Sequence, residues 1–296
     1  MTHTPKKTKA PWYVRAFNAD YLARYKHRSD ALAQVELPFV LQALNLPARA
    51  MVLDLCCGAG RHARGLANAL KKNARIVGLD LSADMLKDAQ SKNTAPQRLC
   101  FIRADMRRIP LATQSVDGVV NLFTSFGYFK TDREHLNVLM EVARVLKPGG
   151  RFVFDFFNRE HVLANLVARS ESQANGCGIV ETRRYDMRSK RIVKTIRITE
   201  ISRKGAKTQR NGTAEILQES IRAYGAGELK AMLIRAGFAP LSVHGDLSGG
   251  AFNAHESARC VWVCEKPKDP RLTLRPAHTS SATRAASLPG RRGKKD

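Results

Sequence analysis

The 296-residue sequence lacks three features, each of which would place it in a particular class of protein. It has no run of roughly 18 consecutive apolar residues, which a membrane-spanning helix needs. Its basic opening lacks the continuous apolar segment of a secretory signal. Its six cysteines show none of the paired spacings that frame small disulfide-bonded domains. We therefore expect a cytoplasmic protein with reduced thiols and no membrane partner.

The sequence also has few acidic residues. It contains 26 Asp and Glu and 50 Lys and Arg, which gives a formal net charge of +24. This balance is typical of proteins that bind nucleic acid or anionic membranes. Much of the excess lies at the ends. Residues 266–296 hold nine Lys or Arg against two Asp, and no acid precedes Asp20. We expect flexible basic tails at 1–11 and 267–296, although the opening also fits an organelle transit peptide.

Apolar segments of strand length alternate along the chain with segments whose apolar residues recur every three or four positions. This alternation predicts parallel βαβ units with helices on both faces of one sheet, in a single α/β domain over residues 12–266. Ser82 and either Thr131 or Asp132 are expected to cap two of the helices. The expected strands are 51–55, 75–81, 99–105, 116–123, 151–157, 239–246 and 257–266, and the expected helices are 61–72, 82–92, 132–146, 159–170 and 227–238, with "LKPGG" at 146–150 between the third helix and its strand.

The regular alternation of strand-like and helix-like segments stops after Asn158. β-favouring and charged residues alternate there around turn-like segments. This pattern predicts an antiparallel insert at about 169–224, lying over the sheet as a substrate lid.

The segment "VLDLCCGAGRH" at 52–62 places a glycine turn between a strand and a helix. Gly58, Gly60 and Ala63 fit the pattern G-x-G-x-x-A, and Asp80 follows Gly60 by twenty residues at the end of the next strand. The glycines let the backbone approach a ligand, and Asp80 can accept hydrogen bonds from both hydroxyls of a ribose. The turn therefore predicts a site for a nucleoside-containing cofactor.

Asp54 indicates which cofactor this is. Its carboxylate is expected to point toward the cradle in which a nicotinamide cofactor would place a doubly anionic pyrophosphate, and like charges repel. S-adenosylmethionine has no phosphate and carries an ammonium group and a sulfonium, which an acid favours. Asp105, in "RADM" at the end of the following strand, can accept a hydrogen bond from the adenine amino group.

At this point the sequence resembles the class I S-adenosylmethionine-dependent methyltransferases. The resemblance runs from roughly Tyr21 to Lys266 and rests on "VLDLCCGAGRH", "IVGLDLSADML", "IRADMRRIPL", "VDGVVNLFTSFGYF", "EVARVLKPGGRFVFDFFN" and "YGAGELKAMLIRAGF". It implies a doubly wound, Rossmann-like sheet of seven strands, S-adenosylmethionine as cofactor, and methyl transfer to nitrogen or oxygen of a small molecule. The methyl acceptor itself is not specified by these motifs.

The resemblance also implies roles for individual residues. The family usually has glycine where Cys56 stands, and a small thiol is tolerated there if the local φ is negative. In the N-terminal helix, Tyr21, Tyr25 and Arg28 are spaced to share a face, where they cover the cofactor carboxylate or pack as core and rim. The implied cofactor-binding residues are Asp54, Cys56, Gly58, Gly60, Asp80, Leu81, Met85, Ala104, Asp105, Met106, Leu122, Tyr21 and Arg28.

The adjacent cysteines also fit two other kinds of site, a zinc site and a reactive thiol. Zinc needs about four ligands, and Cys56, Cys57 and His62 supply three at most, so we predict no metal. A reactive thiol of low pKa beside a helix N-terminus is an alternative, although no CxxC motif supports it.

Methyl transfer is an in-line displacement, for which the protein mainly supplies alignment and dry packing. Tyr128 is the first candidate for a catalytic residue that orients the acceptor. Asn158 and Arg222 are candidate substrate contacts, and His244 and His255 are further candidates.

The charge of the insert leaves a rival function open. Residues 169–210 hold twelve Lys or Arg against four Asp or Glu, which could attract RNA or form a solvated, protected sheet edge. Tyr185 is the only aromatic residue there, which argues against stacking on single-stranded bases. We favour a small-molecule acceptor over an RNA methyltransferase, and a non-catalytic cofactor-binding scaffold is the third hypothesis.

Overall fold

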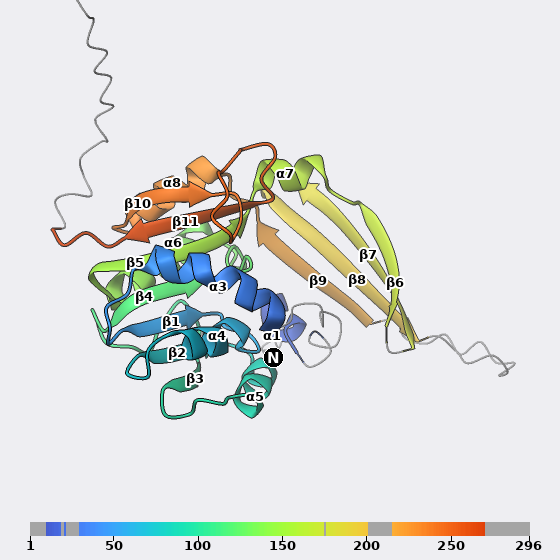
Figure 1. Cartoon of the computed structure of the whole chain (residues 1–296). Coiled ribbons are helices and arrows are strands. Elements are labelled where there is room, and N and C mark those ends of the chain that lie inside the picture. Colours follow the sequence, from blue (N-terminus) through green and yellow to red (C-terminus); the bar gives the residue numbers. More distant parts are fainter. Residues whose placement is uncertain (1–9, 19–20, 22–29, 175, 201–214, 270–296) are drawn as a thin grey trace, which may run out of the picture.

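A computed structural model of the protein describes residues 10–18, 21, 30–174, 176–200 and 215–269. Tyr25, Arg28 and most of the two predicted tails lie outside these ranges. The chain forms an α/β core with a second, smaller sheet beside it (Figure 1).

The core sheet has seven strands in the order β10-β11-β5-β4-β1-β2-β3. All pairs from β5 to β3 are parallel, and β11 runs antiparallel to both of its neighbours. The chain crosses over between β3 and β4, so the sheet is doubly wound as predicted. The strands are β1 (Met51–Leu55), β2 (Arg75–Asp80), β3 (Leu99–Arg103), β4 (Val116–Asn121), β5 (Leu146–Phe157), β10 (Ala239–His244) and β11 (Arg259–Glu265).

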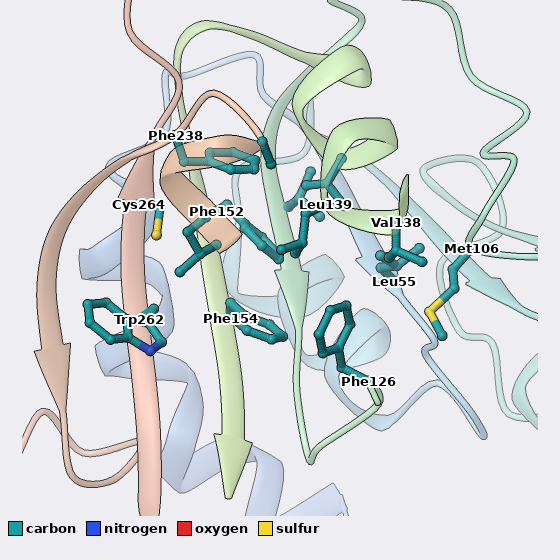
Figure 2. Close-up of a cluster of buried hydrophobic side chains, with 14 of the residues drawn as sticks. Leu55, Met106, Phe126, Val138, Leu139, Phe152, Phe154, Phe238, Trp262 and Cys264 are labelled. Carbon is teal, nitrogen blue, oxygen red and sulfur yellow. The ribbon is translucent and has the colours of Figure 1, made fainter. Parts of the chain in front are cut away.

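Helices cover both faces of this sheet, because alternate residues of each central strand are apolar on both sides. On one face, Phe152 and Phe154 of β5 pack with Leu139 of α6 and Trp262 of β11 (Figure 2). On the other face, Val52 of β1 packs among residues of α3 and α4. The helices are α1 (Trp12–Ala16), α3 (Asp30–Leu44), α4 (Arg61–Ala69), α5 (Ala83–Ser91), α6 (Asp132–Val145), α7 (Arg159–Ala164) and α8 (Ala226–Arg235).

Two helix starts follow the predicted capping. The Ser82 hydroxyl accepts a hydrogen bond from the Met85 backbone N–H at 3.2 Å, which begins α5. Thr131 caps α6 in a reciprocal capping box with Glu134. Both caps orient a helix that follows a strand end at the carboxyl edge of the sheet.

Two predicted boundaries are wrong. The segment "LKPGG" does not separate α6 from a strand, because β5 begins at Leu146 and pairs there with Val116 of β4. The predicted helix 159–170 ends at Ala164, because Arg169 and Ser170 pair with β7 in a strand that the helical spacing did not indicate.

The insert after β5 is a four-stranded antiparallel sheet in the order β6-β7-β8-β9. Its strands are β6 (Arg169–Ala174), β7 (Cys177–Asp186), β8 (Arg191–Glu200) and β9 (Glu215–Arg222), with β9 nearest the core (Figure 1). The Arg222 N–H donates to the Gly127 carbonyl at 2.9 Å, which joins β9 to the loop after β4. The predicted fold, with an antiparallel insert after the fifth strand, is confirmed. Across the described ranges, no helix is long and apolar enough to cross a membrane.

Candidate functional site: a nucleoside cradle under the insert

The turn between β1 and α4 is built on three left-handed residues. Cys56, Gly58 and Gly60 have φ of 60°, 54° and 76°. A Cβ at Gly60 would lie 2.8 Å from the ring of Phe101, so glycine is required there both for its φ and for space. A Cβ at Gly58 would meet nothing within 4 Å. The backbone at Gly58 is therefore open to a ligand.

Cys56 has a positive φ, whereas a cysteine replaces glycine without strain only at negative φ. A left-handed conformation costs a non-glycine residue about 1 kcal/mol or more. The Cys56 thiol donates to Met106 Sδ at 3.4 Å, a contact that glycine could not make. Burial, and then the nearby acids, raise the pKa of Cys56 and of Cys57 well above the usual range. Both thiols are therefore protonated, which argues against the reactive-thiol interpretation.

Asp54 is the penultimate residue of β1 and a buried acid, with 2% of its surface exposed. Burial raises its pKa to about 6, while His62 and the backbone N–H of Ala63 act in the opposite direction. Within the described part of the chain, its Oδ2 has no hydrogen-bond partner. Such an atom costs free energy unless a donor reaches it. A cationic or hydrogen-donating ligand would satisfy it.

Asp80 fastens the end of β2 to the glycine turn. Its Oδ2 accepts from the Gly58 backbone N–H at 2.9 Å, and its Oδ1 accepts from the Ser82 N–H at 2.8 Å. Burial raises its pKa above the usual range, although these two N–H groups lower it. Each carboxylate oxygen accepts more than one hydrogen bond. Asp80 can therefore hold the turn and a ribose together.

Asp105, just after β3, has its carboxylate bound by Arg107. The Nε and Nη2 groups of Arg107 donate hydrogen bonds to it at 2.7 to 3.2 Å. Burial acts to raise the pKa of Asp105, but the hydrogen bonds from Arg107 outweigh it and hold that pKa below the usual range. Arg107 also bonds Glu134 at 2.7 Å and lies 4.3 Å from the centre of the Phe129 ring. The carboxylate is thus fixed at the rim of the cradle.

Asp54, Cys56, Gly58, Asp80 and Asp105 line one cavity of about 880 Å³, a volume typical of ligand sites, whereas Gly60 does not line it. Cys56, Gly58 and Ala59 of the glycine turn line this cavity, and so do Lys194, Glu219 and Ile221 of the insert. Arg28 lies outside the described residues. Of the cofactor-binding residues expected from the sequence, the cavity brings together Asp54, Cys56, Gly58, Asp80, Leu81, Met85, Ala104, Asp105, Met106, Leu122 and Tyr21.

Tyr128 also lines this cavity, and its hydroxyl donates to the Thr124 carbonyl at 3.0 Å. Burial raises its pKa well above the usual range, and the nearby acids Glu219 and Asp80 add to that effect. Trp12 packs edge-on against its ring, with centroids 5.1 Å apart. Tyr128 is therefore a neutral wall residue, placed between the cradle and the insert.

The two predicted substrate contacts do not reach the cavity. Asn158 is 1% exposed and its amide donates to the carbonyls of Ala254 and Ser257, which ties down the loop before β11. Arg222 is 6% exposed and pairs with Glu228 at 2.7 Å. The Arg222 guanidinium and the Asn158 amide nitrogen are therefore already bound inside the protein, while Asn158 Oδ1 is buried without a hydrogen-bond partner among the described residues.

The two further histidine candidates are also absent from the cavity wall. His244 lies against Gly249 and Ser242, and His255 is exposed.

The sequence did not indicate a strained segment on the opposite wall. Phe123 and Thr124 both have positive φ, at 58° and 59°. The fully buried Asp155 accepts the Phe123 N–H at 2.7 Å and is paired with Arg259. The Phe123 ring lies 3.9 Å from the Arg61 guanidinium and 4.7 Å from that of Arg259. Only pairing across strands brings these residues together, so no local motif could have indicated them.

The donor set fits S-adenosylmethionine better than a dinucleotide. Asp54 would hold the ammonium group, Asp80 the ribose, and Asp105 the edge of the adenine, with Leu81, Met85 and Met106 as apolar contacts. No group of three His, Cys, Asp or Glu side chains able to hold a metal is found among the described residues.

Comparisons with known proteins agree with this geometry. Residues 52–150 match the family model of the methyltransferase domain. The putative methyltransferase YqeM of Bacillus subtilis is 38% identical over 111 residues, covering 38% of this chain and 44% of that protein. The demethylmenaquinone methyltransferase of Lactiplantibacillus plantarum is 36% identical over 150 residues, covering 49% of this chain and 58% of that protein.

Among solved structures, the CcbJ methyltransferase from Streptomyces caelestis superposes with a TM-score of 0.68 at 18% identity, covering 86% of this chain and 98% of that one. Against the curated relatives, by contrast, the chain spans about half of their length. Residues 52–150 therefore match the methyltransferase domain family, and the chain has the fold of solved methyltransferases such as CcbJ.

Proposed function

We propose that the protein transfers the methyl group of S-adenosylmethionine to a nitrogen or oxygen of a small molecule. The observation that carries the proposal is Asp54, a buried acid with an unsatisfied oxygen beside an open glycine turn. Bound there, the cofactor would supply an electrophilic methyl group. The protein would orient the cofactor through Asp54, Asp80 and Asp105 and exclude water with the aromatic walls around Tyr128.

A small molecule suits the cavity better than RNA does. The insert faces the cavity with Ile221 and a Lys194–Glu219 ion pair rather than with unpaired basic groups. Four of the twelve Lys and Arg at 169–210 also pair with acids of the insert, which weakens an electrostatic footprint for RNA. The local pairs are Arg169 with Glu171, Arg183 with Glu181, Arg184 with Asp186, and Lys194 with Glu181.

The curated relatives support a small acceptor, since one acts on demethylmenaquinone by its name. We propose a cytoplasmic setting because all six cysteines are free thiols. Incubating the full chain with methyl-labelled cofactor and either total RNA or a metabolite extract separates the two acceptors. Label recovered in RNA rather than in small molecules would favour the rival function.

Calorimetry with S-adenosylmethionine tests the cofactor site. We expect the full chain to bind it, and Asp80→Asn to weaken binding by at least about ten-fold, because the neutral side chain loses charge-assisted hydrogen bonds to the ribose. Asp84→Asn, in the exposed first turn of α5, is the matched control and should bind as the parent does. No binding by the parent would refute the proposal.

A further inference from the structure

The end of the cavity nearest the insert carries one acid and one base side by side. Lys194 of β8 and Glu219 of β9 are register partners, so their side chains share the face of the insert that meets the cavity. Lys194 Nζ lies 3.4 Å from Glu219 Oε2 and 3.1 Å from Glu181 Oε1. The side chains of Lys194 and Glu219 are each 15% exposed. The charged groups of Lys194 and Glu219 are therefore mostly shielded from water.

Glu219 is the less satisfied of the two acids. Within the described ranges it has a single ion pair, at 3.4 Å, and no hydrogen bond. Glu181 by contrast pairs with Arg183 and Lys194, accepts from Ser170, and does not line the cavity. A carboxylate at the wall of a cavity with unused acceptor positions is suited to a ligand that donates hydrogen bonds.

The space between Glu219 and the cofactor cradle is walled by aromatic rings. The Tyr128 ring has neighbours at centroid distances of 5.1 Å for Trp12, 5.7 Å for Phe17 and 6.4 Å for Tyr13. All four of these residues line the cavity. Such a chamber favours an apolar or aromatic skeleton and leaves a carboxylate as its polar contact.

We infer that Glu219 binds the amino group of the methyl acceptor, and that the acceptor is an amine on an aromatic or other apolar skeleton. This inference rests on the proposed function and chooses nitrogen within it. A hydroxyl acceptor needs a strong base to remove its proton, whereas an uncharged amine attacks with its own lone pair. Tyr128 and Cys56 retain their protons because burial raises the pKa of each, and a carboxylate such as Glu219 is too weak a base to remove the proton of an alcohol, although it can accept one from the cation formed on nitrogen.

The transfer balances without a further reactant. The amine nitrogen forms a bond to the methyl carbon, and the carbon–sulfur bond breaks with its electron pair going to sulfur. The positive charge passes from sulfur to nitrogen, and the proton on that nitrogen leaves to the Glu219 carboxylate and then to water. An N–H held on Glu219 leaves the lone pair of the amine to face the methyl group. The fixed negative charge also stabilises the cation that forms.

Matched pairs of small probes test this assignment in the full chain. Benzylamine, 2-phenylethylamine and tryptamine are titrated by calorimetry in the presence of S-adenosylhomocysteine, each against the alcohol of the same skeleton. We expect at least one amine to bind about ten-fold or more tightly than its alcohol. Glu219→Gln should remove that preference. Glu181→Gln, which changes the neighbouring acid outside the cavity, should keep it within about two-fold.

Equal or absent preference for the amines, or a preference that survives Glu219→Gln, would overturn the inference. A second measurement uses deuterated-methyl cofactor with a metabolite extract, and the labelled product should carry its methyl group on nitrogen. A product methylated on oxygen or carbon would also overturn it. Failure of the parent chain to bind S-adenosylhomocysteine would instead refute the proposed function, so the two failures are distinguishable.

Discussion

Arg191 Nη1, on β8 of the insert, donates to the carbonyl oxygen of Phe129 in the loop after β4 over 2.9 Å. Its Nη2 donates to the carbonyls of Gly127 and Tyr128 at 3.1 and 3.3 Å and to that of Ser220 at 2.6 Å. One guanidinium therefore fastens the insert to the backbone on both sides of Tyr128. Burial lowers the pKa of Arg191, which shows how far it is removed from water.

Arg191→Lys is expected to loosen this junction. An ammonium group cannot span the carbonyls that the planar guanidinium fork reaches, so we expect the free energy of unfolding to fall by about 1–3 kcal/mol. Hydrogen exchange should also quicken at the amides of 127–129. Arg184→Lys, on the exposed face of β7, is the control and should change the free energy of unfolding by less than about 0.5 kcal/mol. Equal effects of the two substitutions would contradict the clamp.

Asp54 should make both stability and cofactor affinity depend on pH. Its pKa rises from roughly 3.9 in the unfolded chain to about 6 in the folded protein. The folded state therefore binds more protons between about pH 4 and 6, and stability falls as the pH rises through that range. At pH 7 and without cofactor, we expect the free energy of unfolding of Asp54→Asn to be about 1–3 kcal/mol higher than that of the parent. Urea denaturation from pH 4 to 7 measures the difference.

Cofactor affinity should move in the opposite direction, because the ionised carboxylate attracts the ammonium group. Calorimetry should show S-adenosylmethionine binding that strengthens from pH 5 to 7 in the parent and stays flat in Asp54→Asn. A variant that binds as tightly as the parent at pH 7 would show that Asp54 does not contact the cofactor.

Cys56 allows a direct test of backbone strain. At an ordinary position glycine is less stable than alanine by about 0.4–1 kcal/mol, but at positive φ the order reverses. We expect the free energy of unfolding of Cys56→Gly to be about 1 kcal/mol higher than that of Cys56→Ala. Comparing the two variants cancels the loss of the thiol and its contact with Met106. Denaturation midpoints that place alanine above glycine would argue against the left-handed turn at Cys56.

The core of the fold could be predicted because its signals are local. The spacing of apolar residues predicted α4, α5 and α6, and the turn residues marked where the strands of the core end. Two boundaries could not be predicted this way. Leu146 extends a strand because Val116 lies beside it, and Arg169 joins a strand because β7 pairs with it. Pairing with a distant segment overrides the local preference for helix or turn in both cases.

The meeting of the three acids at one edge of the sheet was predictable for the same reason. Asp54, Asp80 and Asp105 lie at or just after the carboxyl ends of three parallel strands, and the ends of such strands meet at one edge. The acceptor side was not predictable. Asn158 and Arg222 were expected at the substrate and instead hold loops, whereas Glu219 reaches the cavity because β8 and β9 pair in one particular register.

The sequence by itself determined the alternation of strands and helices, the glycine turn, and the three acids that belong with it, because each depends on residues close together in the chain. Tertiary structure alone decided the φ of Cys56, the clamp between Arg191 and the Tyr128 loop, and the ion pair of Lys194 with Glu219. Each of these requires two segments far apart in sequence to meet at a set distance. Such contacts decide which polar groups form hydrogen bonds within the protein and which can still bind a ligand.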